Sequence, residues 1–471
     1  MDIQGAHVWR QCQTMWNIKN FIRYDNNILN PRVSHFNGGK DNLYRYEFPI
    51  MQWSIAQIHH LLGDDIIICR ISLFIIGLFG AIGLFYLCNF YFEDQLTASI
   101  TAILFQFSPI FFYYTINPIP DLFALSASFW FLYFILKERK TRKLIDLIWA
   151  SCFLLLATLA KLPFLMFSVV IMYFFFREII KERALGFRQM LYAMVPLFFL
   201  LPAFAWYAWV MPGWTDNPIL TGIFKNQVPW EKYFEILTYH YETMFPQILL
   251  YPPVWLFVFL GIFTMFKTKS DKGWIIVLAL ITFLYLFLQL NAIGTSHDYY
   301  MFPFMPWLYL LVGFGTKFIL DSKFKLAPLI ILRMLIYAPI HTSIKTKESW
   351  GMERTGFNKD LFKYRQELRA AAPQDARCVI LNDISKFIFS YQIDKMGYVF
   401  HYDHLPAPWL DDMIRDYEAS YMYSDSRIVD ENPEIRKYID EMVLDAGSVH
   451  VFKLVSKEQA LEMRANKRLS E

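Results

Sequence analysis

Ten long apolar runs constrain the fold of this chain more than any other feature of its sequence. An α-helix needs about 20 mostly apolar residues to cross a bilayer, and the runs approach or reach that length. Composition agrees, because 56% of the residues are hydrophobic and only 18% are charged, against about 25% charged in soluble domains. We therefore expect an all-α polytopic membrane protein with its helical bundle in residues 66–341. The runs cover residues 66–88, 97–116, 121–137, 144–160, 162–177, 190–211, 253–267, 273–291, 303–320 and 326–341.

Lys and Arg residues are distributed unequally between the loops that join these runs. One set of alternate loops, which includes 137–143 and 177–189, contains fourteen of them, whereas the other set contains three. Loops rich in Lys and Arg lie on the cytoplasmic side of a membrane. We therefore expect a multi-pass protein of the inner (cytoplasmic) membrane with four segments on its outer side. These are residues 2–65, 212–252, 297–300 and the C-terminal region.

The expected outer location of residues 1–65 raises a question about how they cross the membrane. The segment carries six basic residues, and no apolar helix precedes it to lead it across. We expect an additional transmembrane helix to be encoded upstream of Met1. The alternative is unaided translocation of the N-terminal tail.

The pattern changes from about residue 345, where charges return. Short apolar runs at 378–381, 398–402 and 449–454 have the length of strands. They alternate with two polar stretches, 409–423 and 433–445, that favour helix. Residues 342–471 are therefore expected to form a small external α/β domain, which leaves residues 1–65 as a first external loop with a catalytic role.

Ionisable residues near the apolar runs gather at the expected outer ends of those runs. Arg70, Asp121 and Lys161 all lie at such ends, and the polar residues 297–300 lie on the same side. A transporter would more often place such groups near the middle of the bilayer, on interrupted helices. Only Arg333 lies in the middle of a run. Convergence at one rim favours an enzyme that acts on a lipid head group.

Other interpretations stay open for the chain and for single residues. A polytopic lipid or solute transporter, or a flippase without transferase activity, would need a similar bundle, and so would a non-catalytic scaffold. Arg70 and Lys161 could be interfacial anchors, and Asp121 could cap the helix that it begins. Tyr299 and Tyr300 could belong to the aromatic belt at the membrane surface.

The sequence shows no strong metal, redox or nucleic-acid signal. His401, Asp403 and His404 have the composition of a metal site, but a solvated turn is the favoured interpretation. The five cysteines have no paired spacing, and a net charge of +3 is too small to indicate nucleic acid. We therefore expect no cofactor and no nucleic-acid partner, and the metal requirement stays open.

Several short motifs together resemble a known family. They are HVWRQ at 7–11, EFP at 47–49, Arg70, Ser108-Pro109 followed by Asp121, Lys161-Leu162-Pro163, and His297-Asp298-Tyr299-Tyr300. This set resembles bacterial family-39 glycosyltransferases, which are relatives of the protein O-mannosyltransferases and the lipid A aminoarabinose transferase and have the GT-C fold. The resemblance covers about residues 1–340, and the HVWRQ motif is its most specific part.

The resemblance implies a membrane glycosyltransferase. Such an enzyme takes a sugar from a polyprenyl-phosphate donor and transfers it to a hydroxyl group on a lipid, a glycan or a protein, at the outer side of the membrane. The expected partners are therefore the lipid-linked sugar, the acceptor and the bilayer. The family also begins with a helix ahead of the first external loop, in agreement with the upstream helix expected from charge.

The resemblance also assigns candidate roles to residues. In the family an acidic residue of the first external loop is the expected catalytic base, and Asp2 alone lies at the matching place. The mannosyltransferases carry adjacent Asp and Glu there and this chain does not, so His7 and Glu47 stay open as alternative bases. A phosphate leaving group needs nearby positive charge, for which the candidates are Arg10, Arg70 and Lys161. The expected substrate-binding residues are Trp9, Gln11, Asp121, His297, Asp298, Tyr299 and Tyr300.

Overall fold

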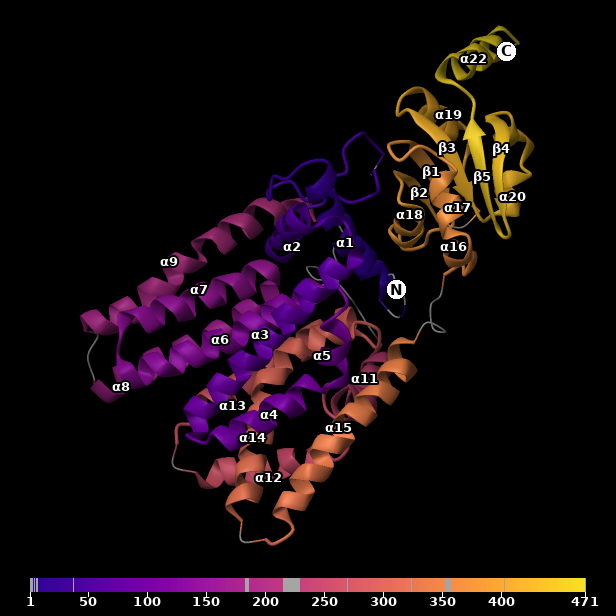
Figure 1. Cartoon of the computed structure of the whole chain (residues 1–471). Helices are drawn as coiled ribbons and strands as arrows, with labels where there is room; N and C mark the ends of the chain where they lie inside the picture. Colours follow the sequence, from indigo (N-terminus) through magenta and orange to yellow (C-terminus); the bar gives the residue numbers. More distant parts are fainter. Residues whose placement is uncertain are drawn as a thin grey trace. The chain divides into compact units, whose positions relative to one another are not determined.

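The chain folds into two compact units, which are shown in Figure 1. The computed structural model describes residues 3, 5, 7–36, 38–182, 186–214, 229–268, 270–322, 324–351, 357–401 and 403–470. Tyr46–Met352 form one unit, which we call the helical unit. Met1–Arg45 and Glu353–Glu471 together form the other, which we call the α/β unit.

The helical unit contains the predicted membrane bundle. Among the described residues, seven helices are long and apolar enough to cross a membrane, or eight if a bent pair counts as one span. The predicted fold class, an all-α bundle with a small α/β domain, is confirmed. The α-helices of this unit are α2 (Ile50–Leu62), α3 (Ile66–Phe92), α4 (Gln95–Gln106), α5 (Pro109–Tyr114), α6 (Pro120–Thr141), α7 (Leu144–Ala160), α8 (Val169–Glu182), α9 (Phe187–Val210), α11 (Trp230–Tyr239), α12 (Val254–Lys267), α13 (Gly273–Ile293), α14 (Met305–Asp321) and α15 (Ala327–Trp350).

Short irregular helices interrupt or extend several predicted spans. The run 97–116 is divided into α4 and α5 at Ser108-Pro109, and α11 and α12 belong to a pair bent by 100°. Proline favours such breaks because it lacks a backbone N–H. The remaining segments are η1 (Leu162–Ser168), η2 (Met211–Gly213), the π-helical η3 (His240–Leu249) and η4 (Asp298–Phe304).

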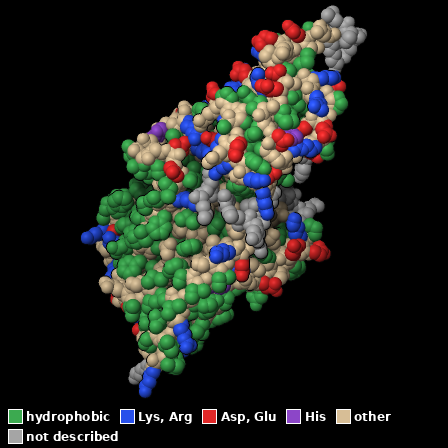
Figure 2. All heavy atoms as spheres, turned by 45° about the vertical axis from the view of Figure 1, so that its right-hand side comes forward, with side chains coloured by type: hydrophobic (Ala, Val, Ile, Leu, Met, Phe, Trp, Pro, Cys, Tyr) green, Lys and Arg blue, Asp and Glu red, His purple; other side chains and the backbone are tan. Residues whose placement is uncertain are grey.

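The surface of the helical unit is apolar over long stretches. Large side chains such as Ile75, Phe198 and Phe263 are more than half exposed, and Figure 2 shows hydrophobic side chains gathered over much of the visible face. Soluble monomers rarely expose continuous apolar areas of this kind. The interior, in contrast, is tight: a Cβ on Gly261 would lie 1.9 Å from the Leu311 carbonyl oxygen. Close contact at a small residue is typical of helices packed within a membrane.

The α/β unit is built on a five-stranded sheet in the order β2-β1-β3-β5-β4. β1 pairs with β2 and β3 in parallel, and β5 pairs with β3 and β4 in the antiparallel sense. The predicted strands at 378–381, 398–402 and 449–454 correspond to β1, β2 and β5. The strands are β1 (Arg377–Leu381), β2 (Met396–Phe400), β3 (Ala419–Ser424), β4 (Ile439–Ala446) and β5 (Val449–Leu454).

The two polar stretches predicted as helices are only partly helical. In 409–423 the helix α19 (Ala407–Arg415) ends early and β3 follows, and in 433–445 the helix α21 (Pro433–Arg436) is short and most of the stretch belongs to β4. Helix was wrong for these strands because sheet pairing outweighs local propensity. The other helices are α16 (Asp360–Lys363), α17 (Arg365–Ala370), α18 (Ile388–Ile393), α20 (Arg427–Asp430) and α22 (Lys457–Ser470).

Successive side chains of β1 belong to two different apolar clusters, one on each face of the sheet. Val379 and Leu381 belong to a cluster with Leu410 of α19. Cys378 and Ile380 belong to a second cluster with Phe389 of α18. Because successive strand residues point to opposite faces, α18 and α19 cover opposite sides of the sheet.

The N-terminal segment is an integral part of the α/β unit. Its helix α1 (Val8–Arg23) packs on α18. Further along, Gly397 of β2 donates a backbone hydrogen bond to Ser34 (3.0 Å) and accepts one from Phe36 (3.0 Å). A Cβ at Gly397 would lie 1.7 Å from the Cys378 carbonyl oxygen, so only glycine fits between the segment and β1.

Candidate active site

A cavity of about 230 Å³ in the helical unit brings three predicted site residues together. Glu47, Lys161 and Tyr300 all line it. Most of the remaining lining is aromatic or aliphatic, with Gln289 as a further polar member. A largely apolar cavity with a few convergent polar groups is typical of a small-ligand site.

Lys161 is held in this cavity by the break between two helices. α7 ends at Ala160, Lys161 is extended (φ −156°, ψ 110°), and η1 begins at the next residue. Its Nζ lies 3.3 Å from Oδ2 of Asp121, and the two residues are 7% and 1% exposed. Burying a charge is costly unless an opposite charge compensates it. The pair therefore allows a cation to be kept in an otherwise apolar site.

Two tyrosines extend the environment of this cation. Nζ of Lys161 lies 5.0 Å from the ring centre of Tyr300 and 5.8 Å from that of Tyr299. The His297 ring stacks on Tyr300 at 5.5 Å between centres. Ring faces attract cations, so the 297–300 segment contributes to the position of Lys161.

Asp298 of the same segment is engaged in a different way. It is 5% exposed, and its carboxylate accepts hydrogen bonds from the Tyr114 hydroxyl (2.7 Å) and from Nε1 of Trp350 (2.6 Å). A buried carboxylate with two donors is stabilised in place. These contacts tie η4 to α5 and to the end of α15.

Glu47 lies between two anchored neighbours. The Tyr46 carbonyl accepts a hydrogen bond from Nε1 of Trp206 (3.0 Å), and the Phe48 amide donates one to the Leu159 carbonyl (3.1 Å). Phe48 also packs edge-on against Trp206 at 5.0 Å between ring centres. The backbone on both sides of Glu47 is therefore fixed against α7 and α9.

The other predicted residues lie elsewhere. Arg70 is in the second turn of α3 and is not part of the cavity lining. His7 and Trp9 line a separate cavity in the α/β unit. Arg10 and Gln11 are buried in α1, where Arg10 hydrogen-bonds Gln13. Asp2, the favoured base, lies outside the described residues.

Several residues that line the cavity were not predicted. Tyr207, Trp214 and Tyr285 are indistinguishable in sequence from the many aromatic residues of a membrane protein. Gln289 had a signal, because it is a polar residue near the end of the apolar run 273–291. No group of three or more His, Cys, Asp or Glu side chains suited to a metal ion occurs in the described part of the chain.

This chain is similar to one known protein family and to several solved structures. Residues 47–209, which include Glu47, Asp121 and Lys161, match the family described as dolichyl-phosphate-mannose-protein mannosyltransferase. No curated protein sequence gives a significant match.

Solved structures are similar over nearly the whole chain. ArnT from Cupriavidus metallidurans in the apo state has a TM-score of 0.68 at 10% identity, with 97% of this chain and 95% of that chain covered. ArnT bound to undecaprenyl phosphate also gives 0.68, at 12% identity and with 96% and 95% covered. The archaeal oligosaccharyltransferase AglB from Archaeoglobus fulgidus, in complex with an inhibitory peptide and a dolichol-phosphate, gives 0.53 at 12% identity, with 90% and 66% covered. The resemblance inferred from the motifs is confirmed: this chain has the GT-C fold of membrane glycosyltransferases, and residues 47–209 match the mannosyltransferase family.

Proposed function

We propose that this protein is a membrane glycosyltransferase that moves a sugar from a polyprenyl-phosphate donor to a hydroxyl acceptor at the outer side of the cytoplasmic membrane. The observation that carries the proposal is the buried Lys161–Asp121 pair, whose lysine lines a cavity together with Glu47. All three residues belong to the segment that matches the mannosyltransferase family. The lipid phosphates named for the ArnT and AglB structures support a donor of the same chemical class.

The chemistry of the reaction explains the need for a buried cation. The bond between the anomeric carbon and the phosphate oxygen breaks, and the leaving phosphate gains negative charge. A fixed positive group in a site of low polarity stabilises that charge more than water would. Lys161 is suited to this role, and Asp121 and Tyr300 would keep its ammonium group directed into the cavity.

The acceptor must also lose a proton as it attacks. Its O–H bond breaks, its oxygen bonds to the anomeric carbon, and the proton passes to a base. Asp2 is our proposed base from the family resemblance, and Glu47, which lines the same cavity as Lys161, is the alternative. A single displacement of this kind inverts the anomeric centre and needs no covalent enzyme intermediate.

The remaining candidate roles follow the same scheme. Arg10 and Arg70 are proposed to assist at the phosphate, and His7 to act beside the base. Trp9, Gln11 and the segment 297–300 are proposed to bind substrate. The tail of the donor would lie along the apolar helix surface.

Donor turnover in a reconstituted membrane tests the proposal. The protein is placed in liposomes with undecaprenyl phosphates that carry mannose, glucose or aminoarabinose, together with a membrane extract as the source of acceptors. We expect release of undecaprenyl phosphate and labelled product from at least one donor, and about a hundredfold less of both, or lower still, from liposomes that contain the Lys161→Ala variant. Both signals are needed, because donor loss alone could be hydrolysis.

The same liposomes separate the transferase from a flippase. A flippase would move the lipid-linked sugar between leaflets, and equally so with Lys161→Ala, without releasing undecaprenyl phosphate. Movement without release for all three donors would contradict the proposed function.

A further inference from the structure

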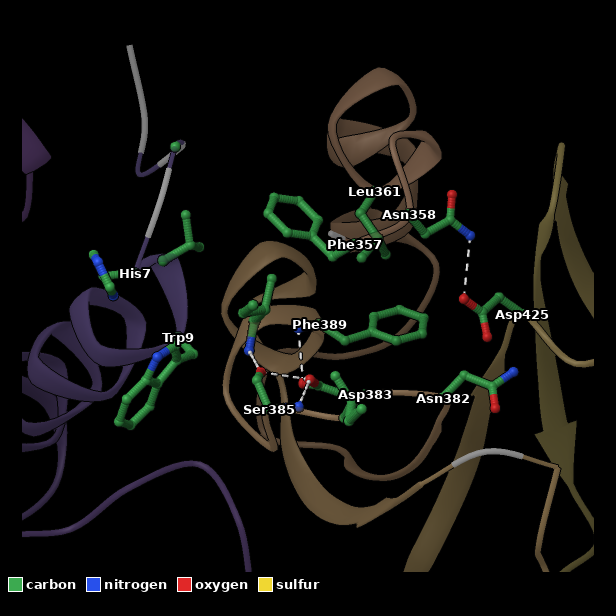
Figure 3. Close-up of a pocket in the computed structure, with 14 residues that line it drawn as sticks. His7, Trp9, Phe357, Asn358, Leu361, Asn382, Asp383, Ser385, Phe389 and Asp425 are labelled. Carbon is green, nitrogen blue, oxygen red and sulfur yellow. Dashed lines mark hydrogen bonds between the residues drawn. The ribbon is translucent and has the colours of Figure 1, made fainter. Parts of the chain in front are cut away.

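A second cavity, of about 590 Å³, lies in the α/β unit, and its carboxylates Asp383 and Asp425 have no role in the transfer chemistry described above. Its volume is within the roughly 300–1,000 Å³ range of small-ligand pockets. Figure 3 shows it from within, with His7 and Trp9 of the α1 segment on one side and Asn382, Asp383 and Asp425 near the strands.

The cavity lies where the sheet topology favours ligand binding. Asn382 and Asp383 follow β1 directly, and Asp425 follows β3 directly. The chain leaves β1 toward α18 on one face, whereas after β3 it packs Val429 of α20 into the core of the opposite face. In a strand order such as β2-β1-β3, this divergence opens a crevice at the carboxyl ends of β1 and β3.

The charges of the lining disfavour an anionic ligand. Its titratable residues are His7, Asp383 and Asp425, and none of the described lining residues is Lys or Arg. A phosphate or carboxylate would face two acidic side chains without a compensating cation. Val8 and Trp9 at the start of α1 also line the cavity, as do Ile388 and Phe389 of the six-residue helix α18.

The two carboxylates have different tasks. Asp383 is 4% exposed and is used within its own loop, where it accepts hydrogen bonds from the Ser385 amide (3.0 Å) and the Phe389 amide (2.9 Å). Oδ2 of Asp425 accepts a hydrogen bond from the Asn358 amide (3.2 Å). Its Oδ1 is buried and has no hydrogen-bond partner within the described ranges. Burial raises the pKa of Asp425, and the Asn358 and Asn382 amides oppose that rise.

The apolar lining complements these polar groups. Trp9, Phe357 and Phe389 line the cavity, and the Asn382 amide offers both donors and acceptors. The Asn358 amide is engaged with Asp425, Asp360 and Ser448. Amides and a carboxylate match hydroxyl groups, and rings match a flat face of C–H bonds. A sugar ring presents both kinds of surface and carries no charge.

We propose that this cavity binds an uncharged saccharide. Hydroxyl groups of the sugar would donate to the Asp425 carboxylate, which Asn358 holds in place, and would exchange hydrogen bonds with Asn382. One sugar face would pack on the aromatic residues. The site goes beyond the proposed transfer reaction, because binding here requires neither a lipid-linked donor nor turnover. It gives the α/β unit a ligand of its own.

Direct binding to the full chain tests this proposal. The protein is placed in lipid nanodiscs, since maltoside detergents are themselves saccharides. Saturation-transfer NMR is then recorded with the methyl glycosides of glucose, galactose, mannose and N-acetylglucosamine. Adenosine and glucose 6-phosphate serve as probes of other chemistry. We expect at least one glycoside to bind, glucose 6-phosphate to bind more weakly than its neutral counterpart, and adenosine not to bind.

Variants then locate the binding. Asp425→Ala and Asn358→Ala should each weaken the glycoside about tenfold, the loss expected for a hydrogen bond to a charged or buried group. Asp440→Ala is the matched control, because Asp440 is an exposed carboxylate on β4 that pairs with Lys453 outside the cavity. Protection of the buried Cys378 thiol from a labelling reagent shows whether each variant is folded.

Three results would overturn the proposal. The first is that none of the four glycosides binds the wild-type protein. The second is that glycoside binding is unchanged in folded Asp425→Ala and Asn358→Ala. The third is that adenosine or glucose 6-phosphate binds instead and depends on Asp425. This experiment measures binding and not sugar transfer. Each of these outcomes can therefore be interpreted even if the glycosyltransferase assay fails.

Discussion

Each unit of this protein contains a lysine–aspartate pair in which the lysine is buried, and the two pairs differ in their surroundings. In the helical unit, Lys161 and Asp121 are 3.3 Å apart and Lys161 lines a cavity. In the α/β unit, Lys19 and Asp394 are 2.6 Å apart, and Arg23 adds a second cation at 3.0 Å. Neither Lys19 nor Asp394 is among the residues that line the two cavities described above. Both lysines are therefore buried and paired with an aspartate. They differ in that Lys161 lines a cavity, and this is the feature that indicates a catalytic role.

The partners of the second pair explain what it stabilises. Lys19 and Arg23 belong to α1, whereas Asp394 follows α18, so the ions join the N-terminal helix to the C-terminal domain. Nζ of Lys19 also lies 4.6 Å from the ring centre of Tyr391. The contacts are local to the packing of α1 on α18, and a structural role accounts for all of them.

The largest expected effect is on turnover when the lysine of the cavity is removed. Lys161→Ala should lower the rate of sugar transfer about a hundredfold or more, the loss seen when one charge-stabilising donor is deleted from an active site. Transfer in liposomes measures the rate per folded molecule. Lys19→Met is the control, since it also removes a buried lysine, and it should stay within about twofold of wild type. Equal losses of turnover in Lys161→Ala and Lys19→Met would mean that lining the cavity gives Lys161 no special role in transfer.

The second expected effect is on stability, and it concerns the other lysine. Lys19→Met should reduce the free energy of unfolding of the α/β unit by about 2 kcal/mol, less than the roughly 3–5 kcal/mol for a buried charge left alone, because Arg23 still pairs with Asp394. Reaction of Cys378 with 2,2′-dithiodipyridine in urea reports the unfolding, in a background without the other cysteines. Lys453→Met, an exposed lysine of β5, should change stability by less than about 0.5 kcal/mol. A similar loss of unfolding free energy in Lys453→Met would show that the Lys19–Asp394 pair contributes no more to stability than an exposed ion pair.

The two pairs were not equally visible in the sequence. Lys161 stands out because it interrupts a long apolar stretch just before Pro163. The ten runs likewise predicted the helices well, because length and apolar content are local properties of a membrane span. Lys19 is one of several basic residues in a polar segment, and its partner is 375 positions away. A contact between such distant residues leaves no periodic pattern in the chain.

The errors in the α/β unit have a related cause. Residues 439–446 contain Asp440 and Glu441 and favour helix locally, yet they form the edge strand β4 because β5 pairs with them. Charged residues are common on edge strands, where they discourage further pairing. β3 was missed because Glu418 adopts a left-handed conformation (φ 63°) between α19 and the strand, a turn that is rare for residues other than glycine.

The smallest expected effect is a loss of stability at acidic pH, which comes from the Asp394 carboxylate of the α/β unit. Burial alone would raise the pKa of Asp394, but Lys19 and Arg23 more than offset this and hold the pKa well below its usual value. The unfolded chain then binds more protons than the folded one in mildly acidic solution, so stability is present above the unfolded pKa and is lost as the pH falls. Between pH 7 and pH 3 this single group should remove about 1 kcal/mol of stability.

A difference measurement isolates this contribution from the other carboxylates. Urea unfolding of the wild type and of Asp394→Asn, followed at Cys378 with 2,2′-dithiodipyridine because that reagent reacts in acid, gives the stability difference at each pH. The wild-type advantage should shrink as the pH falls from about 5 to 3. The exposed Asp440→Asn should show a much flatter difference, since a solvent-exposed ion pair contributes little to stability. A pH-independent difference for Asp394→Asn would mean that its value lies in packing rather than in charge, and the contrast with Lys161 and Asp121 would then rest on the cavity alone.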